Sequence, residues 1–241
     1  FNKSINSLNR SYANDFIGFA PVFKETNKNY ISSKTNERSS EIDGKYFSEL
    51  LFTEKEIKEI SKLFQENNKT FRNYLNEDAS ENNFKKYATD CKYIHLSTHG
   101  FADESNTLLS GLAFYNSNQS NHRIIENRED GLLYSGEIAC LDIDADLLVL
   151  SSCEGGLGRL VKGEGLIAVS RNFSNTGIPN IMYSLWNVND KSTSEFMIDF
   201  YKQILSGKSY SESMQEVKLK MIKDIDTCYP KIWSSFVLIG I

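Results

Sequence analysis

Short apolar segments alternate with amphipathic helical patterns along most of this 241-residue sequence. Short apolar runs bounded by turn signals are typical of buried strands. We expect strands at Asp15–Phe23, Thr70–Leu75, Cys91–Thr98, Leu108–Tyr115, Leu147–Leu150, Pro179–Leu185 and Phe236–Ile241. The helical spacing of apolar residues predicts helices over residues 53–64, 80–87, 163–173, 191–205 and 209–223. Strands that alternate with helices form parallel sheets, so the sequence predicts an α/β fold.

Composition excludes several classes of protein. Hydrophobic residues make up 40% and charged residues 24%, which is typical of a globular chain rather than a membrane or disordered one. The net charge of −5, with both signs interspersed, argues against a nucleic-acid partner. The four cysteines show no paired spacing, which indicates reduced thiols. We therefore expect a cytoplasmic protein that needs no cofactor and binds neither nucleic acid nor membranes.

The chain divides into a short lead-in and one domain. Residues 1–14 begin with Phe1 and carry no signal-peptide pattern, so we expect them to continue from a longer chain. Residues 15–241 form the predicted domain. Within it, residues 24–50 are polar and lack periodicity, which predicts a long mobile loop. The next helix is expected to have Thr53 as its N-cap and Glu56 at the capping-box position.

Two chemically reactive residues follow predicted strands. His99 comes after the strand at residues 91–98, and Cys153 comes shortly after the strand at residues 147–150. Sites in open parallel sheets form beyond the C-terminal ends of the strands. If the two strands are neighbours, His99 faces Cys153 as in a cysteine nucleophile activated by histidine, and the N–H groups of Gly100 and Cys153 can bind an oxyanion. The spacing alone leaves open that Cys153 is a buried apolar residue and His99 an ordinary loop residue.

Other chemistries have weaker support. Cys91, His95 and His99 recur every four residues, but a strand spreads residues i and i+4 over roughly 13 Å, too far for one zinc ion. We expect no metal site here and interpret His95 as a packed, hydrogen-bonded residue. The glycine-rich run after Cys153 has Glu164 where a phosphate-binding loop needs lysine, so its glycines are better explained as room for an extended peptide. A redox sensor needs a resolving cysteine, and none is adjacent in sequence.

Six short motifs follow one another in a fixed order. They are Ile94–Gly100, Asp130–Leu133, Asp146–Gly158, Gly163–Gly165, Ser184–Asp190 and Trp233–Gly240. This set resembles the CHAT domain, a caspase-like peptidase domain that is often attached to tetratricopeptide repeats and is grouped with separases, metacaspases and caspases. The resemblance covers about Asp15 to Ile241. It implies a caspase-like three-layer sandwich, in which helices cover both faces of a mostly parallel sheet.

The resemblance also implies a function. It assigns His99 and Cys153 as the catalytic dyad of a cysteine endopeptidase that cleaves a protein substrate. Tetratricopeptide repeats upstream are implied as a further domain or partner. The alternative that we keep open is a catalytically silent, caspase-like scaffold in a signalling complex. Because the polar stretches 24–50 and 116–130 are poor in apolar residues, we expect an enzyme that is weakly active until a partner, an upstream domain or a cleavage orders them.

Five residues near these motifs are expected to bind substrate: Ser151, Glu154, Trp186, Asn187 and Asp190. Trp186 resembles the tryptophan that lines the peptide groove of caspases, although an ordinary core tryptophan is the alternative. Asp190 either touches the substrate or caps the helix that follows. Ser151 and Asn187 stand where caspases use glutamine and arginine to clamp aspartate. We therefore expect no preference for aspartate before the scissile bond.

Overall fold

A mostly parallel six-stranded sheet forms the centre of the protein. The computed structural model describes residues 11–23, 39–42, 45–103, 106–116, 130–151, 153–154, 164–186 and 188–240. The strands, in their order across the sheet, are β12 (Phe236–Ile239), β11 (Asn180–Ser184), β9 (Leu147–Leu150), β5 (Cys91–Leu96), β1 (Asn14–Ala20) and β4 (Phe71–Leu75). Only β12 runs antiparallel to its neighbour among these strands. The predicted α/β fold is confirmed.

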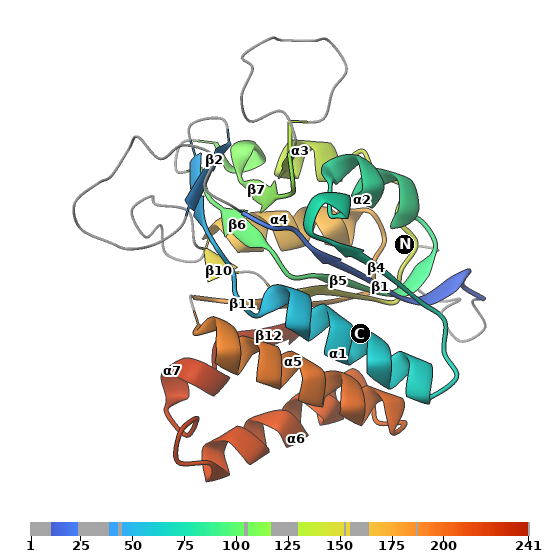
Figure 1. The fold of residues 1–241 in the computed structure, drawn as a ribbon, viewed down its shortest axis with the longest axis vertical. Helices are drawn as coiled ribbons and strands as arrows, with labels where there is room; N and C mark the ends of the chain where they lie inside the picture. The colour runs from blue at the N-terminus through green and yellow to red at the C-terminus, as the bar shows by residue number, and fades with distance from the viewer. Residues whose placement is uncertain are drawn as a thin grey trace.

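Helices cover both faces of this sheet, as Figure 1 shows. One face carries α1 (Thr53–Glu66), α5 (Asp190–Leu205), α6 (Tyr210–Lys223) and α7 (Pro230–Trp233). The other face carries α2 (Glu81–Tyr87), α3 (Ser135–Ile138) and α4 (Glu164–Asn175). The result is the expected three-layer, caspase-like sandwich. Among the described residues, no helix has the length and apolar composition needed to cross a membrane.

Apolar side chains on both faces of each central strand explain this layering. In β9, Leu148 and Leu150 pack into the core beneath α2, α3 and α4, whereas Leu147 and Val149 pack toward α1 and α5. Gly18 of β1 allows α1 to approach closely, because a Cβ atom built there would lie 2.8 Å from the Ile57 side chain. A strand that is buried on both faces reads as a continuous apolar run, which is why β9 is the clearest strand in the sequence.

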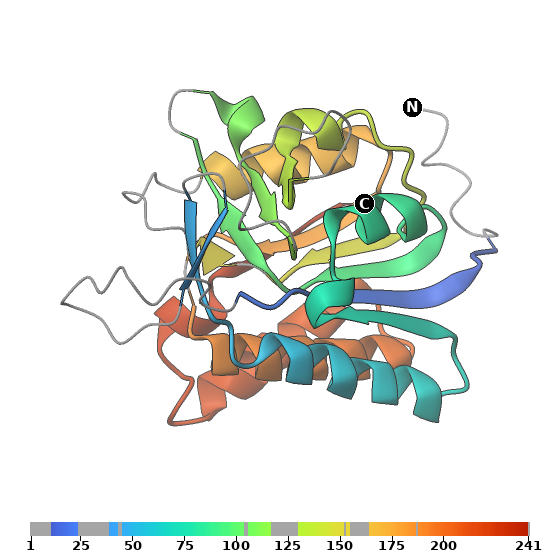
Figure 2. The same cartoon turned by 45° about the horizontal axis from the view of Figure 1, so that its top comes forward.

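A second, smaller sheet lies beyond the C-terminal ends of the central strands. It consists of β10 (Cys153–Glu154), β6 (His99–Phe101), β7 (Gly111–Ala113) and β8 (Leu132–Tyr134), in that order. A separate hairpin, β2 (Ser39–Ile42) with β3 (Lys45–Ser48), stands at the same end of the molecule as β6 and β10 in both views (Figures 1 and 2). Phe23, Phe47, Phe101, Ala113 and Leu132 form a small apolar cluster there, which we call the aromatic cluster.

Several sequence predictions need correction. The expected loop over residues 24–50 contains the β2–β3 hairpin, and residues 24–38 and 43–44 lie outside the described residues. The N-cap of α1 is Phe52 rather than Thr53, and no side chain caps it. The Glu56 carboxylate lies against His95 instead of closing a capping box. The segment expected as one strand over 108–115 begins with the 3-10 helix η3 (Thr107–Leu109) before β7 starts.

Candidate active site

The sheet topology brings the two predicted catalytic positions side by side. Strands β5 and β9 are parallel neighbours in which Leu96 pairs with Leu150, and the Ser151 N–H donates to the Leu96 carbonyl at 2.9 Å. The chain then pairs again between β6 and β10, with Cys153 as the register partner of His99. Neighbouring strands lie roughly 4.8 Å apart. The backbone therefore places His99 and Cys153 directly opposite each other at the C-terminal edge of the sheet.

His99 is enclosed by aromatic rings of the aromatic cluster. Its imidazole lies 5.0 Å from the Phe23 ring and 5.5 Å from the Phe47 ring, measured between centroids. The interplanar angles are 60° and 32°, respectively. Only 1% of the His99 surface is exposed. The preceding residue, Thr98, donates from Oγ1 to the Ala113 carbonyl and so fastens the start of β6 to β7. The position of His99 is thus fixed by packing on one side and by strand pairing on the other.

His95 has the structural environment that its position inside a strand predicts. Its Nε2 lies 2.7 Å from Glu56 Oε1, and its Nδ1 lies 3.3 Å from the Tyr201 hydroxyl. The His95 side chain has no exposed surface, and burial raises the pKa of Tyr201 well above its ordinary value. This histidine joins β5 to α1 and α5. The prediction of a packed, hydrogen-bonded residue is confirmed.

Cys91 confirms the strand assignment that argued against zinc. It begins β5, is buried, and donates from Sγ to the Tyr93 carbonyl at 3.3 Å. Burial raises the pKa of this thiol to about 12. Cys91 is therefore a packed thiol inside the core, as its place in the strand implies.

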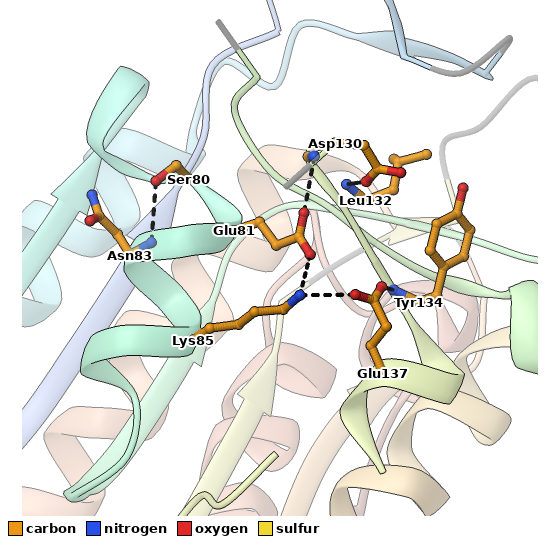
Figure 3. A network of polar contacts seen from close by, with 9 residues as sticks. Ser80, Glu81, Asn83, Lys85, Asp130, Leu132, Tyr134 and Glu137 are labelled. Atoms are coloured by element: carbon orange, nitrogen blue, oxygen red, sulfur yellow. Dashed lines mark hydrogen bonds and ion pairs between the residues drawn. The ribbon is translucent and has the colours of Figure 1, made fainter. Parts of the chain in front are cut away.

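An ion network supports the small sheet from the side of α2. Figure 3 shows Lys85 between two carboxylates, with its Nζ 2.7 Å from Glu81 and 2.9 Å from Glu137. Glu81 is 1% exposed and accepts the Gly131 N–H at 3.0 Å, while Glu137 accepts the Tyr134 N–H at 3.0 Å. These contacts fasten β8 to α2 and α3. Sequence reasoning missed this network, and its one visible signal was the i,i+4 pair of Glu81 and Lys85 on a predicted helix.

Trp186 and Asp190 contact other parts of the protein. The half-buried Trp186 donates its indole N–H to the Lys231 carbonyl of α7 at 2.7 Å. The Asp190 carboxylate accepts the Phe52 N–H at 2.8 Å and so joins the start of α5 to the start of α1. Burial raises the pKa of Asp190. The N-cap of α5 is Asn189, whose side-chain oxygen accepts from the Lys191 and Ser192 N–H groups. The N-cap alternative for Asp190 is therefore wrong.

The remaining predicted site positions are only partly described. Gly100 is buried in β6 and pairs with Glu154 of β10. Ser151 is buried, and its Oγ has no hydrogen-bond partner among the described residues. Asn187 and the side chains of Cys153 and Glu154 lie outside the described part of the chain. Substrate contacts by these residues stay predictions.

The three-layer sandwich, with a histidine and a cysteine on paired strand ends, defines a caspase-like α/β protein. The profile of the CHAT domain matches residues 17–241, which is nearly the whole chain. The chain therefore belongs to the CHAT domain family.

Two curated relatives are named as tetratricopeptide repeat proteins. The chain is 31% identical to tetratricopeptide repeat protein 28 of Mus musculus over 109 residues, and 28% identical to the protein of the same name from Homo sapiens over 109 residues. Each match covers 45% of this chain and 4% of the relative. This chain therefore corresponds to a small part of those proteins.

Proposed function

We propose that this domain is a cysteine endopeptidase that cleaves a protein substrate. The observation that carries the proposal is the register of β6 and β10, which makes His99 and Cys153 direct partners across adjacent strands. Membership of the CHAT domain family supports the same conclusion, because this family resembles caspase-like peptidases. A histidine beside a cysteine is the arrangement that activates a thiol nucleophile.

The mechanism follows from the roles that these positions can take. The Cys153 thiolate attacks the scissile carbonyl, and the electron pair of the C=O bond moves onto oxygen. The N–H groups of Cys153 and Gly100 stabilise this oxyanion. The protonated imidazole of His99 gives its proton to the leaving amine as the C–N bond breaks. Water then hydrolyses the thioester, and His99 acts as the base for that step.

The substrate preference of the proposed enzyme differs from that of caspases. Ser151 is a short, buried side chain at the position two before the proposed nucleophile, where a clamp for aspartate needs a longer polar group. The Asp190 carboxylate is engaged with the Phe52 N–H, so it supplies no cation for such a clamp. An aspartate side chain buried without cationic partners costs several kcal/mol, on the order of 3–5. We therefore propose a basic or neutral residue before the scissile bond.

The relatives support a proposal about the larger assembly. Both are named as tetratricopeptide repeat proteins, and the matched 109 residues cover 4% of each. We propose that this domain acts together with a tetratricopeptide-repeat domain, upstream in the same protein or in a partner, that presents the substrate or controls activity.

Proteome-wide mapping of new N-termini tests the peptidase assignment. The chain is expressed together with its genomic neighbours as wild type, as Cys153→Ala and as Cys140→Ala, and cleaved proteins are identified by mass spectrometry. Cys140 is an exposed cysteine away from the proposed dyad and serves as the matched control. We expect cleavage by the wild type and Cys140→Ala but none by Cys153→Ala. Cleavage that persists in Cys153→Ala, or no cleavage specific to the wild type, contradicts the proposal.

One observation favours a second candidate function. The near-complete burial of His99 is also what a catalytically silent scaffold shows, because such a protein does not need access to its histidine. The same N-terminus mapping separates the two, since a scaffold gives identical results for all three variants.

A further inference from the structure

The described structure holds His99 in a closed environment. A general acid must come within about 2.6–3.2 Å of the atom that receives its proton. With 1% of its surface exposed and two phenyl rings packed against it, His99 offers no approach for a leaving amine. For a peptidase of the kind proposed above, this arrangement is therefore the inactive one.

The ring that closes the site belongs to an element with few backbone ties. Phe47 is fully buried and lies in β3, and β2 and β3 pair only with each other among the described residues. Phe47 is held by side-chain packing, with ring centroids 5.5 Å from Phe23 and 6.2 Å from Phe101. Isolated two-stranded hairpins are marginally stable in water. Moving this hairpin breaks no described ladder hydrogen bond in either larger sheet.

The segment after the hairpin is anchored where it meets α1. The Phe52 N–H at the start of α1 donates to Asp190, and α1 itself packs closely on β1 at Gly18. Residues 49–51 therefore connect the hairpin to an anchored helix. Leu51 of this link is exposed and Leu50 is only partly buried against the aromatic cluster. A change of backbone conformation before Leu51 moves the hairpin without breaking the Phe52–Asp190 hydrogen bond that holds the start of α1.

We propose that the β2–β3 hairpin is an autoinhibitory cap, and that Phe47 is the side chain that closes the His99 side of the candidate site. In the closed state Phe47 and Phe23 hold His99 away from solvent and substrate. Displacement of the hairpin opens the site. The role of this closure in regulating cleavage rests on the proposed peptidase function, whereas the closure itself does not.

Acylation of histidine by diethylpyrocarbonate, followed by mass spectrometry of the peptides, tests the closure without any substrate. The chain has three histidines, and His95 is fully buried, so its peptide reports whether the fold is intact. We expect slow modification of His99 in the wild type and at least about tenfold faster modification in Phe47→Ala, because loss of a buried ring removes several kcal/mol of packing. Wild-type His99 that reacts as fast as a histidine in an unfolded peptide overturns the cap.

Two further variants separate opening from unfolding. Phe47→Leu retains most of the apolar volume and is expected to react at an intermediate rate. Phe71→Ala removes a 36%-exposed ring from β4 at the far edge of the large sheet and is expected to leave the His99 rate unchanged. If His95 is also modified in Phe47→Ala, that variant has lost its fold. The wild type is then compared with Phe47→Leu instead. An unchanged His99 rate in Phe47→Leu, with His95 protected, then contradicts the proposal.

Cleavage rates test whether the hairpin cap regulates the proposed enzyme. Substrates found by N-terminus mapping are expected to be cleaved about tenfold faster by Phe47→Leu than by the wild type if the cap restrains the enzyme. Slower cleavage by a variant whose His99 is more reactive shows that Phe47 positions His99 for catalysis, which overturns autoinhibition. Faster acylation of His99 in a protein that cleaves nothing supports the closure and contradicts the peptidase function instead.

Discussion

His95 and His99 lie four residues apart in the chain but in opposite surroundings. His95 belongs to the large sheet and has Glu56 and Tyr201 at its two ring nitrogens, inside the core between the sheet and its helices. His99 belongs to the small sheet and is packed against phenyl rings opposite Cys153. The difference shows that position relative to the strand end, rather than residue type, decides whether a histidine here supports the fold or stands at the candidate site.

The two regions also differ in what holds them together. The His95 region is fixed by polar contacts among three elements that the central core buries on every side. The His99 region depends on the aromatic cluster and on short strands, with the ion network around Lys85 supporting its outer edge. A change at His95 should therefore appear mainly as lost stability, and a change at His99 mainly as altered activity or access.

The largest expected effect is on catalysis at His99. His99→Ala should lower the rate of peptide cleavage by at least about a thousandfold, because removing one member of a catalytic unit costs nearly as much as removing the whole unit. Loss of the packed imidazole is also expected to lower the melting temperature, but the protein should stay folded because the small sheet retains its strand pairing. The measurement is cleavage of a mapped substrate beside a melting curve. An active His99→Ala enzyme refutes the assignment of this histidine.

His95→Ala should show the reverse pattern. Loss of the imidazole leaves the Glu56 carboxylate buried without its partner, which is expected to cost about 2–4 kcal/mol of unfolding free energy. Denaturant unfolding of His95→Ala, of Glu56→Ala and of the double variant measures the coupling between them. We expect the double variant to be less destabilised than the sum of the two single changes. A stable but inactive His95→Ala protein contradicts the assignment of His95 to the fold and of His99 to catalysis.

Lys85→Met tests the support of the small sheet. It removes the cation between Glu81 and Glu137, so the buried Glu81 carboxylate loses this ion pair, and we expect a loss of about 2–3 kcal/mol of unfolding free energy. Lys58→Met is the matched control, because its i,i+4 pair with Glu54 is exposed on both sides and contributes about 0.5 kcal/mol or less. Equal losses in the two variants, measured by denaturant unfolding, show that the network of Figure 3 has no special role.

The smallest expected effect is the contribution of Asp190 to the pH dependence of folding stability. Burial raises the pKa of this carboxyl, and the charge of Glu56 acts in the same direction. Its ionised form is therefore less favourable in the folded than in the unfolded state, so its contribution to stability falls as pH rises from the ordinary aspartate range through the raised value.

Asp190→Asn keeps an acceptor for the Phe52 N–H but has no charge. In this variant, folding stability should change less with pH above the ordinary aspartate range. We expect a difference within about 1 kcal/mol, read from melting temperatures between about pH 4 and 7. If the asparagine variant melts well below the wild type at neutral pH, the charge itself is needed to hold α1 and α5 together.

Much of the large sheet was predictable from the sequence, because its strands are buried on both faces and appear as apolar runs. The prediction that His99 faces Cys153 assumed that the strands before them are neighbours, and the pairing of β5 with β9 in the structure meets that condition. The contacts that sequence reasoning missed are tertiary. Glu56 matches a capping box locally but lies against His95, and Asn189 rather than Asp190 caps α5, since Asp190 reaches across to α1.

The hairpin at residues 39–48 was missed for a related reason. Its surroundings in sequence are polar and aperiodic, and Phe47 is the hairpin side chain that the structure describes as packed against the rest of the protein. Period-based reasoning needs several apolar residues in phase before it indicates a strand. One anchoring ring falls below that threshold, although it decides the environment of His99.

The central claim is that His99 activates Cys153, and alkylation of cysteines by iodoacetamide near pH 6 tests it without a substrate. The ratio of the Cys153 rate to that of the exposed Cys140 is measured in the wild type and in His99→Phe, which retains a ring among Phe23 and Phe47 but has no base. Because the thiolate is the reactive form, we expect the ratio to fall by about tenfold or more in His99→Phe. An unchanged or higher ratio in His99→Phe would contradict the dyad.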